Sequence, residues 1–323
     1  MFMSDQESTI SQLAKQFGYL PYMVERYIQF LGYDDTVNLL KTNEKPLTPT
    51  IRVNTLKITS QELLKRLKKK GFDYETIKNV PYAVKILKSP SNLGSQHEYL
   101  QGYYYIQNFA SMLPSIMLDP QPVDIVIDMC AAPGSKSTQI AQLMQNEGVL
   151  ILIDRNKNRI PALRVNLNRM GVTNSIVLNF DAKNLNNLKL NPNKILLDAP
   201  CTGEGLIRED SSRKKSRQLT HINKMARIQG KLLESGLKTL DVGGVLVYST
   251  CSIAPEENEL VINSILNNLP DYSIVKMPYL FGLNGIIEYN GILLREDLKY
   301  AQRLYPHIHD TIGFFMCKIK RSS

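Results

Sequence analysis

The sequence lacks the cysteine spacings that hold metals or build disulfide frameworks. Its four cysteines, Cys130, Cys201, Cys251 and Cys317, lie far apart and form no C-x-x-C pair. This spacing argues against a zinc site, and the length of the chain argues against a framework of disulfides. We therefore expect no bound metal, and four reduced thiols.

The sequence also lacks the segments that direct a chain to a membrane. No window approaches the roughly 18 consecutive apolar residues that a membrane helix needs. The first residues are polar and acidic, without the apolar region of a signal peptide. We expect a cytoplasmic protein with no membrane partner, in a compartment where thiols stay reduced and can act as nucleophiles.

The composition is that of an ordinary globular protein with a basic balance. In 323 residues, 43% are hydrophobic and 21% are charged, so the chain has room for one large domain with smaller attachments. The formal net charge of +9 favours a polyanionic partner, because clustered Lys and Arg attract phosphate groups.

Periodicity and prolines divide the chain into three segments. Residues 1–48 show helical spacing of apolar side chains, and residues 49–118 alternate like a small α+β unit. From 119 to 323 short apolar strands alternate with helical patterns, which is typical of a doubly wound α/β domain with a parallel sheet. Strands are expected at 123–128, 149–154, 175–178, 194–198 and 245–249.

A loop of small residues follows the first of these strands and predicts a ligand site. Asp128–Lys136 lets the backbone approach a ligand closely at the carboxyl end of the strand. It matches neither the dinucleotide fingerprint nor the phosphate loop. Asp154 ends the second strand and can accept hydrogen bonds from ribose hydroxyls, and Asp181 follows the third and can receive an adenine amino group. S-adenosylmethionine fits these features, although strand-end aspartates also serve as helix caps.

Two cysteines stand at the ends of separate strands, Cys201 in Asp198–Thr202 and Cys251 in Ser249–Ser252. Free cysteine is commonly a small core residue, but this pair predicts thiolate chemistry on a bound ring. A thiolate that adds to carbon 6 of a pyrimidine makes carbon 5 nucleophilic enough to accept a methyl group. Asp198 can contact the ring, and Lys136 can lower a thiol pKa or orient Asp198.

Five motifs then resemble the Nol/Nop/Sun RNA cytosine-5 methyltransferases, in that family's order over about residues 50 to 318. They are Arg52–Lys57, Cys130–Lys136, Asp198–Cys201, Ser249–Asn258 and Arg303–Phe315. The resemblance implies an RNA-recognition-like unit before a Rossmann-like methyltransferase domain.

The same resemblance assigns roles to residues. It implies that Cys251 attacks carbon 6, that Cys201 assists enzyme release and that Asp198 contacts the cytosine, with Lys136 completing the catalytic set. Asn108 stands where many relatives have aspartate. The expected cofactor-binding residues are Cys130, Ala131, Ala132, Pro133, Gly134, Ser135, Lys136, Asp154, Arg159, Asp181 and Asp198.

The expected function is S-adenosylmethionine-dependent methylation of cytosine carbon 5 in RNA by a monomer without an obligate protein partner, with tRNA favoured and ribosomal RNA the alternative. Two rivals of other classes are a non-catalytic RNA-binding assembly factor and a methyltransferase for protein or small-molecule nitrogen; neither needs a thiol. Arg208 and the segment 213–217 can grip phosphates, or they form a solubilising loop. Aromatic residues at 99 and 103–105 can stack on bases, but half-buried strand aromatics are the preferred interpretation.

Overall fold

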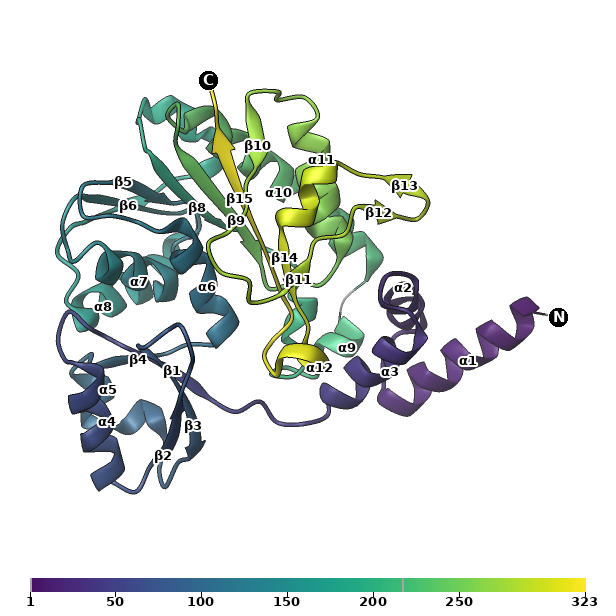
Figure 1. Ribbon diagram of the computed structural model, residues 1–323, viewed down its shortest axis with the longest axis horizontal. Coiled ribbons are helices and arrows are strands. Elements are labelled where there is room, and N and C mark those ends of the chain that lie inside the picture. The colour runs from purple at the N-terminus through teal and green to yellow at the C-terminus, as the bar shows by residue number, and fades with distance from the viewer. Residues whose placement is uncertain (1, 217) are drawn as a thin grey trace.

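The computed structural model describes residues 2–216 and 218–323. Figure 1 shows a group of N-terminal helices, a small sheet and a large sheet that forms the body of the molecule. The N-terminal helices are α1 (Phe2–Phe17), α2 (Pro21–Leu31) and α3 (Tyr33–Thr42). Over the described part of the chain, no helix combines the length and the apolar character needed to cross a membrane.

The small sheet is antiparallel and has the order β2-β3-β1-β4. Its core is formed by one face of the sheet and by α4, whose Leu63, Leu64 and Leu67 are buried at helical spacing. The elements are β1 (Thr50–Val53), α4 (Ser60–Lys69), β2 (Asp73–Thr76), β3 (Ala83–Lys88), α5 (His97–Leu100) and β4 (Tyr104–Ile106).

The large sheet combines a parallel half and an antiparallel half, in the order β11-β14-β15-β9-β8-β5-β6-β7, with β10 paired to β15. The strands β7, β6, β5, β8 and β9 are parallel, and β15 joins β9 in antiparallel register. The strands are β5 (Ile125–Asp128), β6 (Val149–Asp154), β7 (Ser175–Asn179), β8 (Lys194–Asp198), β9 (Val245–Thr250), β10 (Tyr272–Ile274), β11 (Leu283–Asn284), β14 (Gln302–Leu304) and β15 (Phe314–Arg321); a separate hairpin pairs β12 (Glu288–Tyr289) with β13 (Ile292–Leu293). The predicted doubly wound α/β class is confirmed.

Helices cover both faces of the large sheet because its central strands are apolar on both sides. One face packs against α6, α7 and α8, and the other against α10 and α11. The helices are α6 (Phe109–Leu118), α7 (Ser135–Leu143), α8 (Ile160–Met170), α9 (Arg213–Ser216), α10 (Leu219–Thr239), α11 (Glu259–Leu266) and α12 (Pro306–His309). Helix α6 lies before residue 119 but packs on the large sheet.

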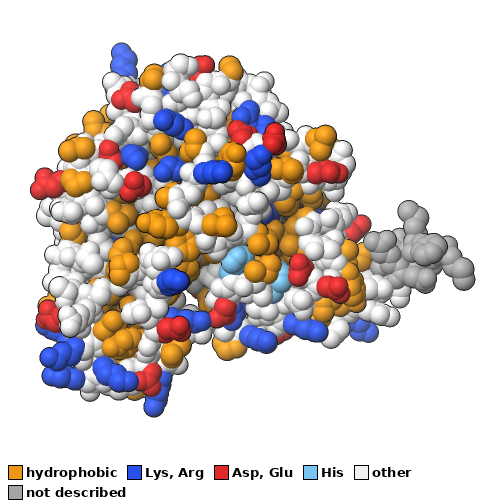
Figure 2. Space-filling view, in the orientation of Figure 1, with side chains coloured by type: hydrophobic (Ala, Val, Ile, Leu, Met, Phe, Trp, Pro, Cys, Tyr) orange, Lys and Arg blue, Asp and Glu red, His pale blue; other side chains and the backbone are white. Residues whose placement is uncertain are grey.

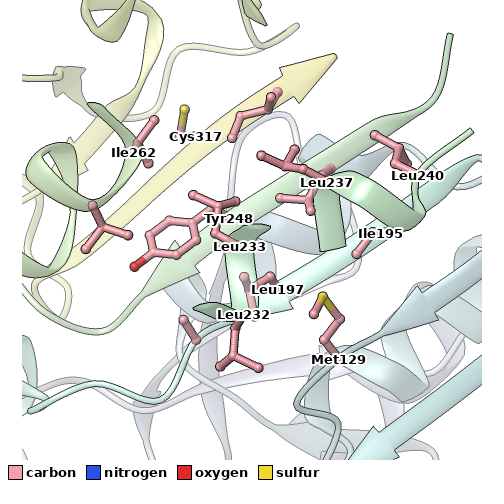
Figure 3. Close-up of a cluster of buried hydrophobic side chains, with 14 of the residues drawn as sticks. Met129, Ile195, Leu197, Leu232, Leu233, Leu237, Leu240, Tyr248, Ile262 and Cys317 are labelled. Atoms are coloured by element: carbon pink, nitrogen blue, oxygen red, sulfur yellow. The ribbon is translucent and has the colours of Figure 1, made fainter. Parts of the chain in front are cut away.

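The α10 face forms the larger buried cluster (Figure 3). Leu232, Leu233 and Leu237 of α10 pack in one cluster with Ile195 of β8 and Tyr248 of β9. Full burial of one such leucine contributes about 1.5–3 kcal/mol. This packing holds β8 and β9 as neighbours, so the segments that follow them leave the sheet side by side.

The N-terminal helices pack beneath those segments. Met23 and Val24 of α2 share a buried cluster with Ile207 and Ile253, which lie just beyond the two strand ends. Arg26 is also buried there and donates to Glu204 at 2.9 Å and to Glu256 at 3.0 and 2.5 Å.

A buried cation is one of the links that join the small sheet to the large one. The guanidinium of Arg52 on β1 donates to Gln107 at 3.0 Å, to Gln142 at 2.8 Å and to Thr138 at 2.7 Å. Burial lowers the pKa of Arg52 to about 9. Because the partners lie on α7 and before α6, this network fixes the small sheet against the loop that begins at Asp128.

Candidate active site

The two strand-end cysteines lie side by side. Cys251 directly follows β9 and Cys201 lies three residues after β8, and these neighbouring strands run parallel. Their sulfur atoms are 3.2 Å apart, and both residues are half-buried. The sheet topology therefore joins two thiols that are far apart in the sequence.

Three of the four thiols, those of Cys130, Cys201 and Cys317, are held in the protonated form. A hydrogen bond with Cys251, followed by burial, raises the pKa of Cys201 well above its ordinary value. Burial raises the pKa of Cys130, with the nearby carboxylate of Asp128 adding to the effect, and burial likewise raises the pKa of Cys317. Cys317 lies in the apolar cluster under α10 and fits the role of a core residue.

A lysine and a serine orient the carboxylate of Asp198. Lys136 Nζ donates to Asp198 Oδ2 at 2.7 Å and to Ser111 Oγ at 2.9 Å. Ser249 Oγ donates to the other carboxylate oxygen at 2.8 Å. The Lys136 ammonium also lies over the ring of Phe314, 5.6 Å from its centroid. Both carboxylate oxygens are engaged, so the direction of the carboxylate is defined.

A cavity of about 410 Å³ extends from the cysteines along the carboxyl ends of the parallel strands. It is within the size range of small-ligand sites. Polar and charged residues line it together with apolar side chains of α10; the lining includes Cys130, Ala132, Asp154, Asp181, Asp198, Cys201, Ile228, Leu232 and Cys251.

The carboxylates in this cavity are held by backbone amides. Asp154 is buried and accepts from the amides of Ala132 at 3.1 Å and Asn156 at 2.8 Å. Arg159 reaches Asp154 at 3.4 Å and donates to the carbonyl of Ala132. The amide pattern fixes the carboxylate so that a ligand hydroxyl can donate to it.

Asp181 has both roles expected of an aspartate that follows a strand, as a helix cap and as a residue of the ligand cavity. It caps the short helix Ala182–Leu188 by accepting from the Lys183 amide at 3.1 Å, and it lines the cavity as well. Partial burial raises its pKa, but the hydrogen bonds from Lys183 outweigh this effect and leave the pKa below its ordinary value. Asp181 is thus ionised at neutral pH.

The loop of small residues leads from β5 into the first turn of α7. Ala131 is buried and donates its amide to Ile153 at 2.9 Å. Gly134 has φ +107°, and a Cβ there would lie 3.0 Å from Leu163, so this position requires glycine. Pro133, Ser135 and Lys136 face a second cavity, described next.

The second cavity has a volume of about 380 Å³ and is lined by residues from both sheets. It shares Asp198, Leu206 and Cys251 with the first cavity, so the two cavities meet at these residues. Its other lining residues are Tyr105, Ile106, Gln107, Asn108, Ser111, Pro133, Ser135, Lys136, Ile312 and Phe314. At its edge Asn108 donates to Glu209 at 2.6 Å.

The basic residues after Cys201 are mostly engaged within the protein. Arg208 donates to Asp310 at 2.9 Å, Arg213 donates to the Thr202 carbonyl at 2.9 Å, and Lys214 pairs with Glu44. Lys215 is exposed, and Arg217 lies outside the described residues. Hence the solubilising and phosphate-gripping interpretations of this stretch both give way to a packing role for Arg208, Arg213 and Lys214.

Comparisons with known proteins identify the family. A family model described as 16S rRNA methyltransferase RsmB/F matches residues 115–320, and one described as the RsmF/B-like ferredoxin-like domain matches residues 21–92. The chain belongs to the RsmB/F (Nol/Nop/Sun) methyltransferase family. The resemblance expected from the motifs is confirmed.

Members of the RsmB/F family with known names include both ribosomal and transfer RNA enzymes. The 25S rRNA (cytosine-C(5))-methyltransferase nop2 of Schizosaccharomyces pombe is 34% identical over 98% of this chain and 53% of its own length. The tRNA (cytosine(49)-C(5))-methyltransferase of Pyrococcus abyssi is 36% identical over 93% of this chain and 95% of its own. The chain thus spans about half the length of the first curated relatives it matches.

A solved structure shares the whole RsmB/F fold seen here. The methyltransferase homolog protein of Pyrococcus horikoshii superposes with a TM-score of 0.88 at 41% identity, over 97% of this chain and 99% of that one. The RsmB/F family uses S-adenosylmethionine, which confirms the expected cofactor. The buried carboxylate of Asp154 and the apolar wall from α10 in the first cavity fit a nucleoside of this kind.

Sequence reasoning missed several residues of the site. Ser111 on α6 lies far from the cysteines in sequence and carries no motif that points to it. Tyr105 on β4 was expected as a half-buried strand aromatic, and Phe314 on β15 lies inside the motif Arg303–Phe315, but neither was expected beside Cys251. Ser249 lay inside a recognised motif, where its position before Cys251 offered a signal.

Proposed function

We propose that this protein methylates carbon 5 of cytosine in RNA, with S-adenosylmethionine as the methyl donor and tRNA as the favoured substrate. The observation that carries the proposal is the pair of thiols 3.2 Å apart at the junction of two cavities, beside an oriented carboxylate. The cofactor occupies the first cavity and the target base enters from the second.

The reaction begins at Cys251. Its thiolate forms a bond to carbon 6 of the cytosine, and the electrons of the ring double bond move to carbon 5. Asp198, held by Lys136 and Ser249, accepts a hydrogen bond from the exocyclic amine or from a protonated ring N3. When bound, S-adenosylmethionine would supply the electrophilic methyl group that carbon 5 accepts, and S-adenosylhomocysteine would be the leaving group.

Release of the enzyme requires that the bond between Cys251 and carbon 6 break again. The proton on carbon 5 leaves to a base, its electrons restore the ring double bond, and the bond between Cys251 and carbon 6 breaks. Cys201 assists this step, since its sulfur lies next to the departing sulfur of Cys251. Cys130, Ala131, Ala132, Pro133, Gly134, Ser135, Lys136, Asp154, Arg159, Asp181 and Asp198 are assigned to cofactor binding and its support.

The substrate assignment rests on likeness to a tRNA enzyme and on charge. The Pyrococcus abyssi tRNA enzyme is 36% identical to this chain over 93% of this chain's residues. On the face shown in Figure 2, Lys and Arg side chains follow the lower edge, over the small sheet and the N-terminal helices. This distribution supports a binding mode in which the RNA contacts both the small sheet and the N-terminal helices.

The organisation that we propose keeps three units, at 1–48, 49–118 and 119–323, with α6 as the segment that joins the second unit to the third. We further propose a cytoplasmic monomer without an obligate partner protein. Ribosomal RNA is the second candidate substrate, and the named rRNA relatives favour it. A non-catalytic assembly factor would have no need for two adjacent thiols beside Asp198.

RNA that contains 5-azacytidine tests the mechanism, because it traps the covalent adduct. Cys251→Ala should abolish trapping. Cys201→Ala should accumulate a protein–RNA adduct on ordinary RNA in the presence of the cofactor. Persistent trapping by Cys251→Ala would reverse the assignment of the two cysteines.

The substrate needs a separate measurement. Bisulfite sequencing of total RNA after incubation with enzyme and cofactor should reveal new protected cytosines in tRNA. Protection confined to ribosomal RNA would select the second candidate.

A further inference from the structure

A buried glutamate ties together the backbone segments that carry both cysteines. Glu257 lies in the turn between β9 and α11 and is fully buried. One carboxylate oxygen, Oε2, accepts from the hydroxyl of Thr202 at 2.5 Å and from the hydroxyl of Ser252 at 2.6 Å. Thr202 directly follows Cys201, and Ser252 directly follows Cys251. A single atom therefore bridges the two cysteine segments.

The second carboxylate oxygen of Glu257, Oε1, links helix α10 to the two cysteine segments. Oε1 accepts from the Thr202 amide at 2.8 Å and from Gln229 Nε2 at 3.0 Å. The same Gln229 nitrogen donates to the Pro200 carbonyl at 2.9 Å, so α10 also grips the backbone on the other side of Cys201. Glu257 thus receives four hydrogen bonds, which is the full capacity of an ionised carboxylate.

The donors require a carboxylate at this position. The Thr202 backbone N–H and the Gln229 Nε2 group can only donate, and Ser252 Oγ already accepts from the Ala254 amide at 3.2 Å. Burial raises the pKa of Glu257, and the bonds from Ser252, Thr202 and Gln229 act in the opposite direction. Among the described residues, none of its hydrogen-bond donors is a cation, so directed hydrogen bonds hold the carboxylate in place.

We propose that Glu257 is a positioning residue for the reaction, whose carboxylate fixes the separation of the Cys201 and Cys251 thiols. The proposal rests on the function proposed above, in which one thiol attacks and the other assists release. Misplacement of reacting groups by about 1 Å can slow a step about 100-fold. Glu257 holds the two cysteine segments in place relative to each other. Loss of its carboxylate would therefore allow such a displacement.

Glu257→Gln is the informative variant because it keeps the length of the side chain. With its amide nitrogen at the Oε1 position, the Thr202 and Gln229 amides lose their acceptor. With the nitrogen at the Oε2 position, the hydroxyl protons of Thr202 and Ser252 lose theirs. Either way two of the four hydrogen bonds to the side chain at position 257 are lost, and the two cysteine segments are free to separate.

The first measurement reports the thiol separation without RNA or cofactor. Diamide removes two hydrogen atoms from the thiols of Cys201 and Cys251, which forms a disulfide and reduces the reagent to its hydrazine. The sulfur atoms need to close only from 3.2 Å to the length of a disulfide bond, about 2.05 Å. Wild type should form this disulfide rapidly, and Glu257→Gln about tenfold more slowly. Mass spectrometry of peptides that contain the linked pair supplies the rate.

The second measurement is the rate of adduct formation on 5-azacytidine RNA. Glu257→Gln should lower the maximal rate by about 10- to 100-fold and leave the concentration of RNA at half-maximal rate unchanged. Glu98→Gln is the matched control, since Glu98 is buried on α5, far from the cysteines in the chain, and pairs with Lys70 at 2.5 Å. It should retain wild-type rates in both assays even if it lowers stability.

The outcomes separate this inference from the proposed function. Wild-type rates for Glu257→Gln in the diamide assay overturn the positioning role, whether or not the enzyme methylates RNA. Absence of an adduct with wild type refutes the proposed function, while the diamide rates still decide the role of Glu257. If Glu257→Gln does not fold, Thr202→Val removes one hydroxyl donor and should slow both assays roughly threefold; unchanged rates in that variant overturn the proposal.

Discussion

Replacement of Lys136 by methionine tests how the carboxylate of Asp198 is oriented. Methionine preserves the apolar length of the side chain over Phe314 but removes the ammonium that donates at 2.7 Å to Asp198 and at 2.9 Å to Ser111. Of the hydrogen bonds among the described side chains, Asp198 then keeps only the one from Ser249 at 2.8 Å. Its carboxylate is free to rotate about that bond.

The expected loss follows from the hydrogen bond that is removed. A bond to a charged group contributes roughly 1.5–3 kcal/mol, which corresponds to a rate reduction of about 10- to 150-fold if the bond is needed only for the reactive geometry. Ser249→Ala removes a hydroxyl donor from the same charged carboxylate without removing a charge, and a cost of about 1.5 kcal/mol, the low end of that range, predicts a reduction of about tenfold.

The assay is a single-turnover measurement of methyl transfer to RNA, with cofactor and RNA in excess of their dissociation constants. The double variant Lys136→Met with Ser249→Ala completes a cycle, and the two losses should not add, because both donors restrain one carboxylate. A rate for Lys136→Met within about twofold of wild type would refute the orienting role.

Three further predictions concern stability and backbone fit. Arg52→Lys should lower the free energy of unfolding in urea by on the order of 3 kcal/mol, because an ammonium cannot satisfy the buried acceptors that the guanidinium reaches; an unchanged midpoint would contradict this. Burial raises the pKa of Glu204 from 4.5 to about 7, so the folded state binds more protons than the unfolded state in this window, and stability should fall as the pH rises through it. Glu204→Gln should flatten that dependence in urea titrations at several pH values, and an unaltered slope would count against it. Gly205→Ala would place a Cβ 2.0 Å from a backbone carbonyl oxygen and 2.8 Å from the carbonyl oxygen of Cys251, so adduct formation should slow by at least about tenfold. The control Gly230→Ala meets its nearest neighbour at 3.7 Å and should match wild type.

The fold class was predictable, and candidate reactive residues could be named, because both depend on local pattern. Short apolar runs separated by helical spacing determine a parallel sheet, and the carboxyl ends of such strands meet at one edge. Asp128, Asp154 and Asp198 end their strands as expected. The motifs around Cys201 and Cys251 identified the family because the residue types and their order are specific.

The tertiary structure decided how these residues are held. Arg26 and Arg52 had no visible partners in the sequence, since each is buried against acceptors more than 50 positions away. The basic residues Arg208 and Lys214 looked available for RNA, but long-range contacts with Asp310 and Glu44 engage them. Such pairings depend on the packing of distant elements, which periodicity does not encode.

The sequence by itself thus determined the order of strands and helices and the cofactor class, and it predicted the thiol chemistry, because neighbouring residues specify these features. Only the folded chain decided that the two sulfur atoms lie 3.2 Å apart, that two cavities meet there, and that Glu257 bridges both segments. The physical reason is that burial and hydrogen bonding act through space, between groups that many intervening residues separate along the chain.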